Sequence, residues 1–377
     1  LYHRVRTTLL VVCVSIAMFL PLAVHVLVGT YNRIMIERSD ATPLVVGAQG
    51  SAYDLVLNTL YFKGRLDQRL TMADVKEVSR SGLATPVPIY VRFSAGNLPV
   101  VGTSLDYFAF RKLTPAQGTL PQVIGDVVLG ATAAERLGVG VGEKILSDPE
   151  KMYDISSTYP LLMRVVGILA ETGTADDMVL FTDVKTTWII EGIGHGHADA
   201  TKVTDPRLLT AASDSKVVMS AAVVKFTEVT QELLDSFHFH GREKEFPVSA
   251  IIALPHDARS ATILKARYRL SDTAQAVIPR KVVAEMMDIV TRVRRFLDAI
   301  FGMVLMSTVL FLVLVVLLSL RIRRREIQTL TKIGCSRWTV FAVQSSEIAL
   351  LLAVSLAVAA ALLGAVMWYV IRFDVLL

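Results

Sequence analysis

Histidine spacing is the feature of this sequence that most directly suggests chemistry. Two pairs follow the pattern His-x-His, namely His195 with His197 and His238 with His240. On an extended strand the side chains at i and i+2 share a face, and imidazole nitrogens are common ligands of zinc and copper. The four histidines therefore predict a metal site, for zinc in the first instance, if the fold brings the two pairs together. The alternative interpretation is that all four are exposed loop residues.

Patterns typical of catalysis are missing from the rest of the sequence. The glycine-rich stretch 138–144 resembles a phosphate-binding loop, but Glu143 separates the last glycine from Lys144, and Ile145 stands where a serine or threonine is required. There is no Gly-x-Ser-x-Gly, His-Glu-x-x-His or Cys-x-x-Cys motif. We therefore expect no catalytic site in this chain, and any energy-driven work would need ATP hydrolysis by another protein.

Three long apolar blocks dominate the hydropathy pattern of the 377 residues. Hydrophobic residues make up 53% of the chain and charged residues only 19%, against about a quarter in typical soluble domains. Residues 8–29, 299–320 and 348–371 contain no Lys, Arg, Asp or Glu, and about 20 apolar helical residues can cross a bilayer. This pattern excludes a wholly soluble enzyme and a channel built only of spans. It predicts an α-helical membrane protein with one large water-exposed domain between the first and second spans.

The basic residues near the apolar blocks predict how the chain is oriented. Arg4 and Arg6 precede the first block, and the segment between the second and third blocks is rich in Arg and Lys. Because basic flanks stay on the cytoplasmic side, we expect residues 30–298 to face the other side. These flanks also account for the net charge of +5. Because the positive charge lies beside the apolar blocks and not on the outer region, we exclude nucleic acid as a partner. Neither Cys13 nor Cys335 lies in the outer region, so that region has no disulfide.

The outer region is predicted to be an α+β domain because short strand-like and helix-like patterns alternate along it. Ser51 and Thr71 each begin a capping-box pattern that predicts the start of a helix. Residues 87–93 have the composition of a strand, and Pro88 favours an edge position because proline lacks a backbone N–H. Residues 190–245 show the least regular pattern and are predicted to form a loop-rich insertion.

A continuous helix is predicted to lead from the outer domain into the second span. Apolar residues recur at helical spacing through 281–298, and no Pro or Gly interrupts the pattern before Gly302. A helix over 281–320 would be about 60 Å long, and its outer half would form a stalk that either transmits motion or serves only as a tether. The predicted order is an N-terminal segment with the first span (1–29), the outer α+β domain (30–280), the stalk (281–298), the second span (299–320), a cytoplasmic loop (321–347), the third span (348–371) and an outer tail (372–377).

The cytoplasmic loop is predicted to be a basic helical hairpin. Its first part continues the helix of the second span, Gly334 allows a sharp turn, and Ser336 can cap a short second helix that leads into the third span. A short basic helix of this kind is suited to docking on a cytoplasmic partner. The alternative is that its arginines only fix the orientation in the membrane.

Several motifs resemble a known family of permeases. Arg-Arg-Arg-Glu-Ile at 323–327, the turn at 333–337 and Glu347 at the start of the third span resemble the signature of FtsX-like permeases. Leu44-Val-Val-Gly-Ala-Gln-Gly50 and Asp126-Val-Val-Leu-Gly130 resemble the outer domain of MacB-like permeases. The resemblance covers nearly the whole chain.

This resemblance implies the membrane subunit of an ABC transporter of the mechanotransmission type. Such permeases form homodimers in the bacterial inner membrane, and a separate cytoplasmic ATPase binds the ATP and magnesium. A periplasmic adaptor or substrate-binding protein and an outer-membrane duct are possible further partners. The family has four spans, so we expect a fourth beyond the three found here; the alternative is a three-span variant of the family. By resemblance, the ATPase-coupling residues are Arg323, Arg324, Arg325, Glu326, Gly334, Cys335, Ser336, Arg337 and Glu347.

There are two alternatives to this interpretation. An FtsX-like regulator would use the same helices to control a periplasmic cell-wall hydrolase and would transport nothing. A zinc-linked transporter would bind metal at the two His-x-His pairs while exporting or extracting a periplasmic substrate.

Overall fold

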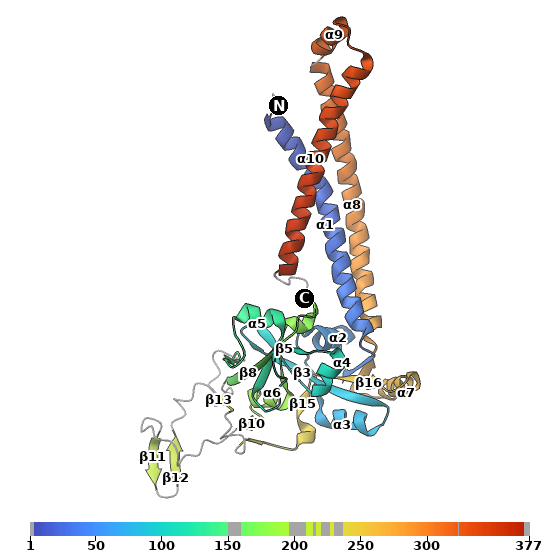
Figure 1. The fold of residues 1–377 in the computed structure, drawn as a ribbon. Helices are drawn as coiled ribbons and strands as arrows, with labels where there is room; N and C mark the ends of the chain where they lie inside the picture. Colours follow the sequence, from blue (N-terminus) through green and yellow to red (C-terminus); the bar gives the residue numbers. More distant parts are fainter. Residues whose placement is uncertain are drawn as a thin grey trace. The chain divides into compact units, whose positions relative to one another are not determined.

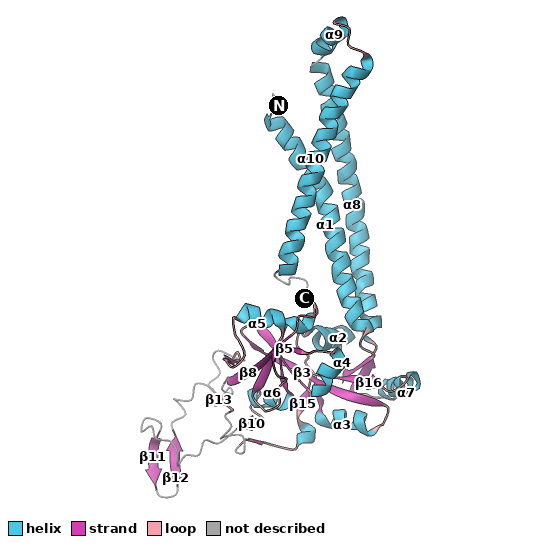
Figure 2. Cartoon of the chain, in the orientation of Figure 1, coloured by secondary structure: helices cyan, strands magenta, loops and turns pink. Residues whose placement is uncertain are grey.

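The computed structural model describes residues 4–149, 160–195, 209–213, 216–219, 227–229, 237–322 and 324–372. They group into two compact units, which Figure 1 shows coloured along the sequence. The helical unit contains the chain up to Met35 and from Glu285 onward, and the sheet domain is Ile36–Ala284. Figure 2 distinguishes the strands, which all lie in the sheet domain among the described residues, from the helices.

The helical unit contains the predicted spans. Its elements are α1 (Arg4–Asp40), α8 (Pro279–Ile322), α9 (Arg324–Lys332) and α10 (Arg337–Arg372). The last residues of α1 and the first residues of α8 belong to the sheet domain. The helical stretches Thr7–Asp40, Pro279–Ile322 and Phe341–Val370 are long and apolar enough to cross a membrane. The prediction of three apolar helices is therefore confirmed, and α8 runs without a break across the predicted stalk and second span.

Apolar surface and a few polar contacts characterise these helices. On α8, Met306 and Leu310 are 69% and 71% exposed, which suits contact with lipid rather than water. The Ser15 hydroxyl of α1 donates to the Ser355 carbonyl oxygen of α10 at 3.0 Å. A hydroxyl between two helices stabilises their packing where no water competes for it.

The sheet domain combines a large mixed sheet with short helices. Its helices are α2 (Ala52–Tyr61), α3 (Met72–Arg80), α4 (Leu105–Arg111), α5 (Ala131–Leu137), α6 (Val184–Ile190) and α7 (Ala258–Arg269), with 3-10 turns η1 (Ala175–Met178) and η5 (Glu243–Glu245). Its strands are β1 (Leu44–Ala48), β2 (Leu70–Thr71), β3 (Ala84–Ala95), β4 (Leu98–Thr103), β5 (Pro115–Gly118), β6 (Asp126–Leu129), β7 (Lys144–Leu146), β8 (Leu161–Leu169), β9 (Leu180–Asp183), β10 (Gly194–His195), β11 (Leu209–Ser213), β12 (Lys216–Met219), β13 (Thr227–Glu228), β14 (His238–Phe239), β15 (Pro247–Val248), β16 (Ala250–Pro255) and β17 (Ala274–Val277).

The main sheet has 11 strands in the described part of the domain. Its order is β13-β8-β6-β9-β4-β3-β16-β1-β17, and β5 and β7 also pair with β8. Strands β4 and β9, β6 and β8, and β13 and β8 are parallel, and the other pairs are antiparallel. All four residues of β6 are buried, as expected for a strand covered on both faces. Separate two-stranded ribbons are formed by β10 with β14, β11 with β12, and β2 with β15.

Local signals in the sequence place several helices correctly. The Ser51 hydroxyl accepts from the Asp54 N–H at the start of α2, and Thr71 and Asp74 form the predicted capping box of α3. Helix α5 ends at Gly138, which has a φ of 63°, a conformation that glycine adopts without the cost of a Cβ.

The prediction of an edge position for the Pro88 strand is wrong. Strand β3 lies inside the sheet, between β4 and β16. However, its pairing with β4 begins only at Ile89, after both Pro86 and Pro88, and the segment 84–88 pairs with β16 alone. The missing N–H groups therefore fall where β3 has a neighbour on one side only, which is why an inner strand tolerates them.

The segment between the second and third apolar helices agrees with the predicted turn but differs in its second part. Gly334 has a φ of 98°, and the Ser336 hydroxyl accepts from the Thr339 N–H at 3.2 Å. The predicted cap at Ser336 is confirmed, but the helix that it begins is not short, because α10 runs as one helix from Arg337 through Glu347 into the third apolar block. No Gly or Pro occurs between Arg337 and Glu347, so nothing ends the helix there.

Candidate coupling site

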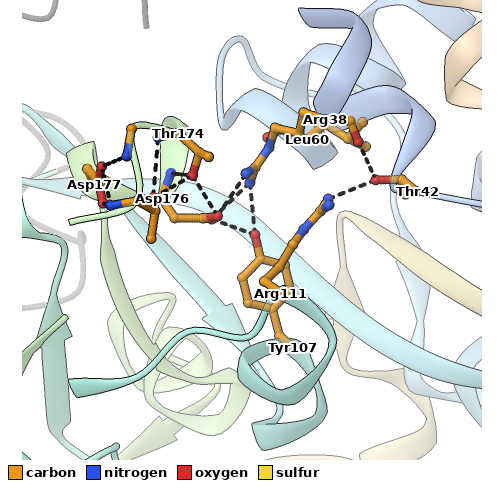
Figure 3. Close-up of polar contacts among 10 residues, drawn as sticks. Arg38, Thr42, Leu60, Tyr107, Arg111, Thr174, Asp176 and Asp177 are labelled. Carbon is orange, nitrogen blue, oxygen red and sulfur yellow. Dashed lines mark hydrogen bonds and ion pairs between the residues drawn. The ribbon is translucent and has the colours of Figure 1, made fainter. Parts of the chain in front are cut away.

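The end of α1 is fixed by a buried ion pair, drawn in Figure 3. Arg38 lies in the last turn of α1 and is 6% exposed, and Asp176 in η1 is 2% exposed. The two guanidinium Nη atoms donate to the two carboxylate oxygens at 2.7 and 2.8 Å. Arg38 Nε donates to the Leu60 carbonyl oxygen at the end of α2. The planar guanidinium thus uses its whole donor fork, a geometry that only arginine provides.

Tyr107 of α4 completes the cluster around the carboxylate. Its hydroxyl donates to Asp176 Oδ1 at 2.7 Å and accepts from Arg38 Nη2 at 3.0 Å. Burial, and next the negative charge of Asp176, raise the pKa of the Tyr107 phenol well above its usual value. The phenol is therefore neutral and available as a donor throughout the physiological range.

The charges of the pair reinforce each other. Burial alone would raise the pKa of the Asp176 carboxyl, but the charge and hydrogen bonds of Arg38 and the Tyr107 hydroxyl outweigh it, so that this pKa lies below its usual value. Burial alone would likewise lower the pKa of Arg38, and the charge of Asp176 reverses that effect. Both groups are therefore ionised, and removing one would leave the other buried without its counter-ion, at a cost of about 3–5 kcal/mol.

A second arginine borders the cluster. Arg111, the last residue of α4, donates to the Thr42 hydroxyl at 2.8 Å, and that hydroxyl donates to the Arg38 carbonyl oxygen at 3.0 Å. The Arg111 guanidinium lies 5.9 Å from the centre of the Tyr107 ring. Burial, and next the like charge of Arg38, lower the pKa of Arg111. Arg111 thus connects α4 to the residues that follow α1.

The turn that carries Asp176 is itself held rigidly. The Thr174 hydroxyl donates to Asp176 Oδ2 at 3.1 Å, and the Asp177 carboxylate accepts from the N–H groups of Thr172 and Gly173. At Gly130, before α5, a Cβ would lie 2.3 and 2.4 Å from the carbonyl oxygens of Asp176 and Asp177. Only glycine allows the backbone before α5 to pack this closely on the turn.

We call Arg38, Tyr107, Arg111 and Asp176 the coupling cluster. Its residues all belong to the sheet domain, and they come from three elements that are far apart in the sequence. A displacement or rotation of the last turn of α1 must therefore either move η1 and α4 with it or break a buried charge pair. The cluster joins these three elements, and its ionised pair and neutral phenol are held by mutual hydrogen bonds, so none of these groups is poised for acid–base or nucleophilic chemistry at neutral pH.

The residues predicted to couple to an ATPase lie in one stretch of the helical unit. Arg324 and Arg325 are exposed on α9, Gly334 and Ser336 are exposed in the turn, and Cys335 is half-buried there. Glu326 is in α9, and Arg337 begins α10. Glu347 is exposed on α10. Arg323 lies outside the described residues.

The structure brings three of the four predicted metal ligands together along the backbone. His195 of β10 stands opposite His238 of β14, and the rings of His238 and His240 are 4.8 Å apart. His197 lies outside the described residues. Among the side chains that are described, no group of three or more His, Cys, Asp or Glu forms a ready metal site.

The sequence matches the family model of the MacB-like periplasmic core domain over residues 7–229, which is more than half of the chain. The chain belongs to this family. The matched stretch begins inside α1 and includes the coupling cluster, and it ends before α8. Members with a MacB-like core domain are permease components of ABC transporters, so the chain is a membrane protein with an extracytoplasmic domain.

Three solved structures resemble parts of the MacB-like chain. The periplasmic region of MacB from Actinobacillus actinomycetemcomitans is 13% identical with a TM-score of 0.37, covering 67% of this chain and 97% of that one. The extracellular domain of the noncanonic ABC-type transporter YknZ from Gram-positive bacteria is 10% identical with a TM-score of 0.34, covering 62% and 98%. A domain of a putative permease from Porphyromonas gingivalis is 7% identical with a TM-score of 0.29, covering 62% and 86%. No curated protein matches.

Sequence reasoning did not identify the coupling cluster. Arg38 and Asp176 are separated by 138 positions, and nothing local shows that they meet. One signal was present, since Asp176 and Asp177 directly precede the apolar stretch Met178-Val179-Leu180, and acidic residues that are buried beside such a stretch need a partner.

Proposed function

We propose that this chain is the permease subunit of an ABC transporter, in which motion of the membrane helices is transmitted to the extracytoplasmic sheet domain. One observation carries the proposal. Helix α1 is a single helix that includes a segment apolar enough to span the membrane and ends at the buried Arg38–Asp176 pair. A flexible tether would need neither an unbroken helix nor a buried ion pair at its end.

Energy for this motion comes from a separate ABC ATPase that docks on α9 and the turn after it. Arg324 and Arg325 supply exposed positive charge on a helix of nine residues. Opposite charge on the partner would steer docking, and reversal of both charges would place like charges in contact. ATP and magnesium bind to that partner, and this chain contributes no catalytic residue.

We further propose that the chain acts as a homodimer in a bacterial inner membrane, as the resemblance to FtsX-like permeases implies. The sheet domain then faces the periplasm, where it drives export or extraction of a periplasmic substrate, with an adaptor and an outer-membrane duct as possible partners. A regulator of a cell-wall hydrolase would differ in one property, because its ATPase activity would respond to the hydrolase and not to any exported molecule.

The test is a paired charge reversal in the full chain, purified from its native membranes together with its ATPase. We expect R324E/R325E to reduce the amount of copurifying ATPase about tenfold or more, which corresponds to at least about 1.4 kcal/mol. R267E/R269E is the matched control, because it reverses two exposed charges on α7 in the sheet domain. Equal recovery of the ATPase with both variants would contradict the docking role of α9.

A further inference from the structure

The ribbon of β10 and β14 has a fixed register. Gly194 pairs with Phe239 and His195 with His238, and the His240 N–H donates to the Ile193 carbonyl oxygen at 2.8 Å. Gly194 explains why the register holds, since a Cβ there would lie 2.6 Å from the Phe239 ring. The aromatic ring lies across the glycine, and a slip by one residue would place a side chain in that space.

The two faces of the ribbon differ in chemistry. The Phe239 ring packs edge-on against Trp188 at 6.1 Å and also contacts Phe246 at 5.8 Å. Phe237 and Phe239 are half-buried, whereas His238 and His240 are exposed. Because side chains alternate along a strand, the apolar face covers the core of the sheet domain and the histidines lie on the opposite, solvent-facing side.

The spacing of these histidines suits one metal ion. Two imidazoles bound to one tetrahedral zinc, with Zn–N distances of about 2.0–2.1 Å, have ring centres about 5 Å apart. The rings of His238 and His240 are 4.8 Å apart and inclined by 73°. His195 occupies the register position directly opposite His238, where Cβ atoms of paired residues are about 4.5–5.5 Å apart.

We infer that His195, His238 and His240 bind a divalent transition metal, Zn²⁺ in the first instance, on the outer face of this ribbon. Three imidazoles leave the fourth position for water or an exogenous ligand. His195 and His238 belong to two different strands that pair with each other, so that the metal joins β10 to β14. The inference goes beyond the proposed function, because it assigns the domain a ligand that transport does not require.

The test is metal binding by the full chain in detergent, carrying an affinity tag without histidines. We expect the metal-stripped protein to bind one Zn²⁺ per chain in calorimetry, and Co²⁺ to give the visible absorption of a tetrahedral site. Both signals should disappear in H238A/H240A, and the affinity for Zn²⁺ should fall at least tenfold in H195A. H256A is the matched control, since His256 is also exposed in the sheet domain and lies outside the ribbon.

Two results would overturn the inference: no binding by the wild-type chain, or equal binding by the wild-type chain and H238A/H240A. Neither would affect the proposed function, which is tested by association with the ATPase. The side chains of His238 and His240 are exposed, and retention of the buried Trp188 fluorescence in H238A/H240A would show that a lost signal is not due to unfolding.

Discussion

Substitution of Asp176 by Asn is the most direct perturbation of the coupling cluster. The carboxylate accepts from both Nη atoms of Arg38, from the Tyr107 hydroxyl and from the Thr174 hydroxyl. An amide of the same shape keeps one acceptor oxygen and turns the other position into a donor that faces a donor. The guanidinium then remains buried without a counter-ion.

The expected loss can be estimated from that geometry. Removing one partner of a buried, hydrogen-bonded ion pair costs about 3–5 kcal/mol, which is a large part of the roughly 5–15 kcal/mol that stabilises a typical domain. Replacing both charges by apolar side chains avoids the unpaired charge, so R38M/D176L should be more stable than D176N.

Denaturant unfolding of the full chain in detergent provides the assay. Trp188 is 1% exposed in the core of the sheet domain, and W338F/W368F would leave it as the only tryptophan among the three in the sequence. In that background, D176N should lower the free energy of unfolding reported by Trp188 by about 3–5 kcal/mol.

Glu243→Gln is the control for this experiment. It removes the exposed pair of Glu243 with Lys76, at 3.3 Å, and should cost less than about 1 kcal/mol. A loss with D176N no larger than the loss with E243Q would refute the reasoning, because it would show that the Arg38–Asp176 pair does not fix the end of α1.

Three further predictions concern the same elements. The pKa of folded Asp176 lies below the ordinary value of 3.8. The ionised carboxylate therefore contributes to the free energy of unfolding above that pH, and this contribution is lost as the pH falls through the lower folded pKa. In acid titration the free energy of unfolding should consequently fall more steeply in the wild type than in D176N. Gly130→Ala should destabilise the sheet domain by about 1–3 kcal/mol, whereas Gly140→Ala, whose Cβ would meet nothing closer than 3.8 Å, should have little effect in the same unfolding assay. Gly334→Ala should reduce ATPase copurification, because the turn needs a φ of 98° that alanine adopts at a cost of about 1 kcal/mol or more; unchanged recovery would show that docking does not depend on this turn.

Features with local causes could be predicted from the sequence. The capping residues Ser51 and Thr71, the stop at Gly138 and the turn at Gly334 depend on residues within a few positions of one another. The three membrane-spanning helices could also be predicted, because length and composition determine whether a helix can cross a membrane.

Features that depend on long-range pairing could not be predicted in the same way. The placement of Pro88 on an inner strand depends on where β4 stops pairing with β3, and the coupling cluster depends on a contact across 138 positions. The histidines lie between these cases. Their spacing suggested a shared face, and only the ribbon showed that His195 stands opposite His238.

The central claim is that nucleotide-driven motion reaches the sheet domain through the end of α1. Hydrogen–deuterium exchange on the complex of full chain and ATPase in lipid nanodiscs, compared with and without ATP trapped by vanadate, tests it most directly. We predict that trapping changes exchange in the last turn of α1 and in the turn containing Asp176, and that R324E/R325E abolishes the change. Identical exchange in both nucleotide states, while the ATPase turns over normally, would contradict the account.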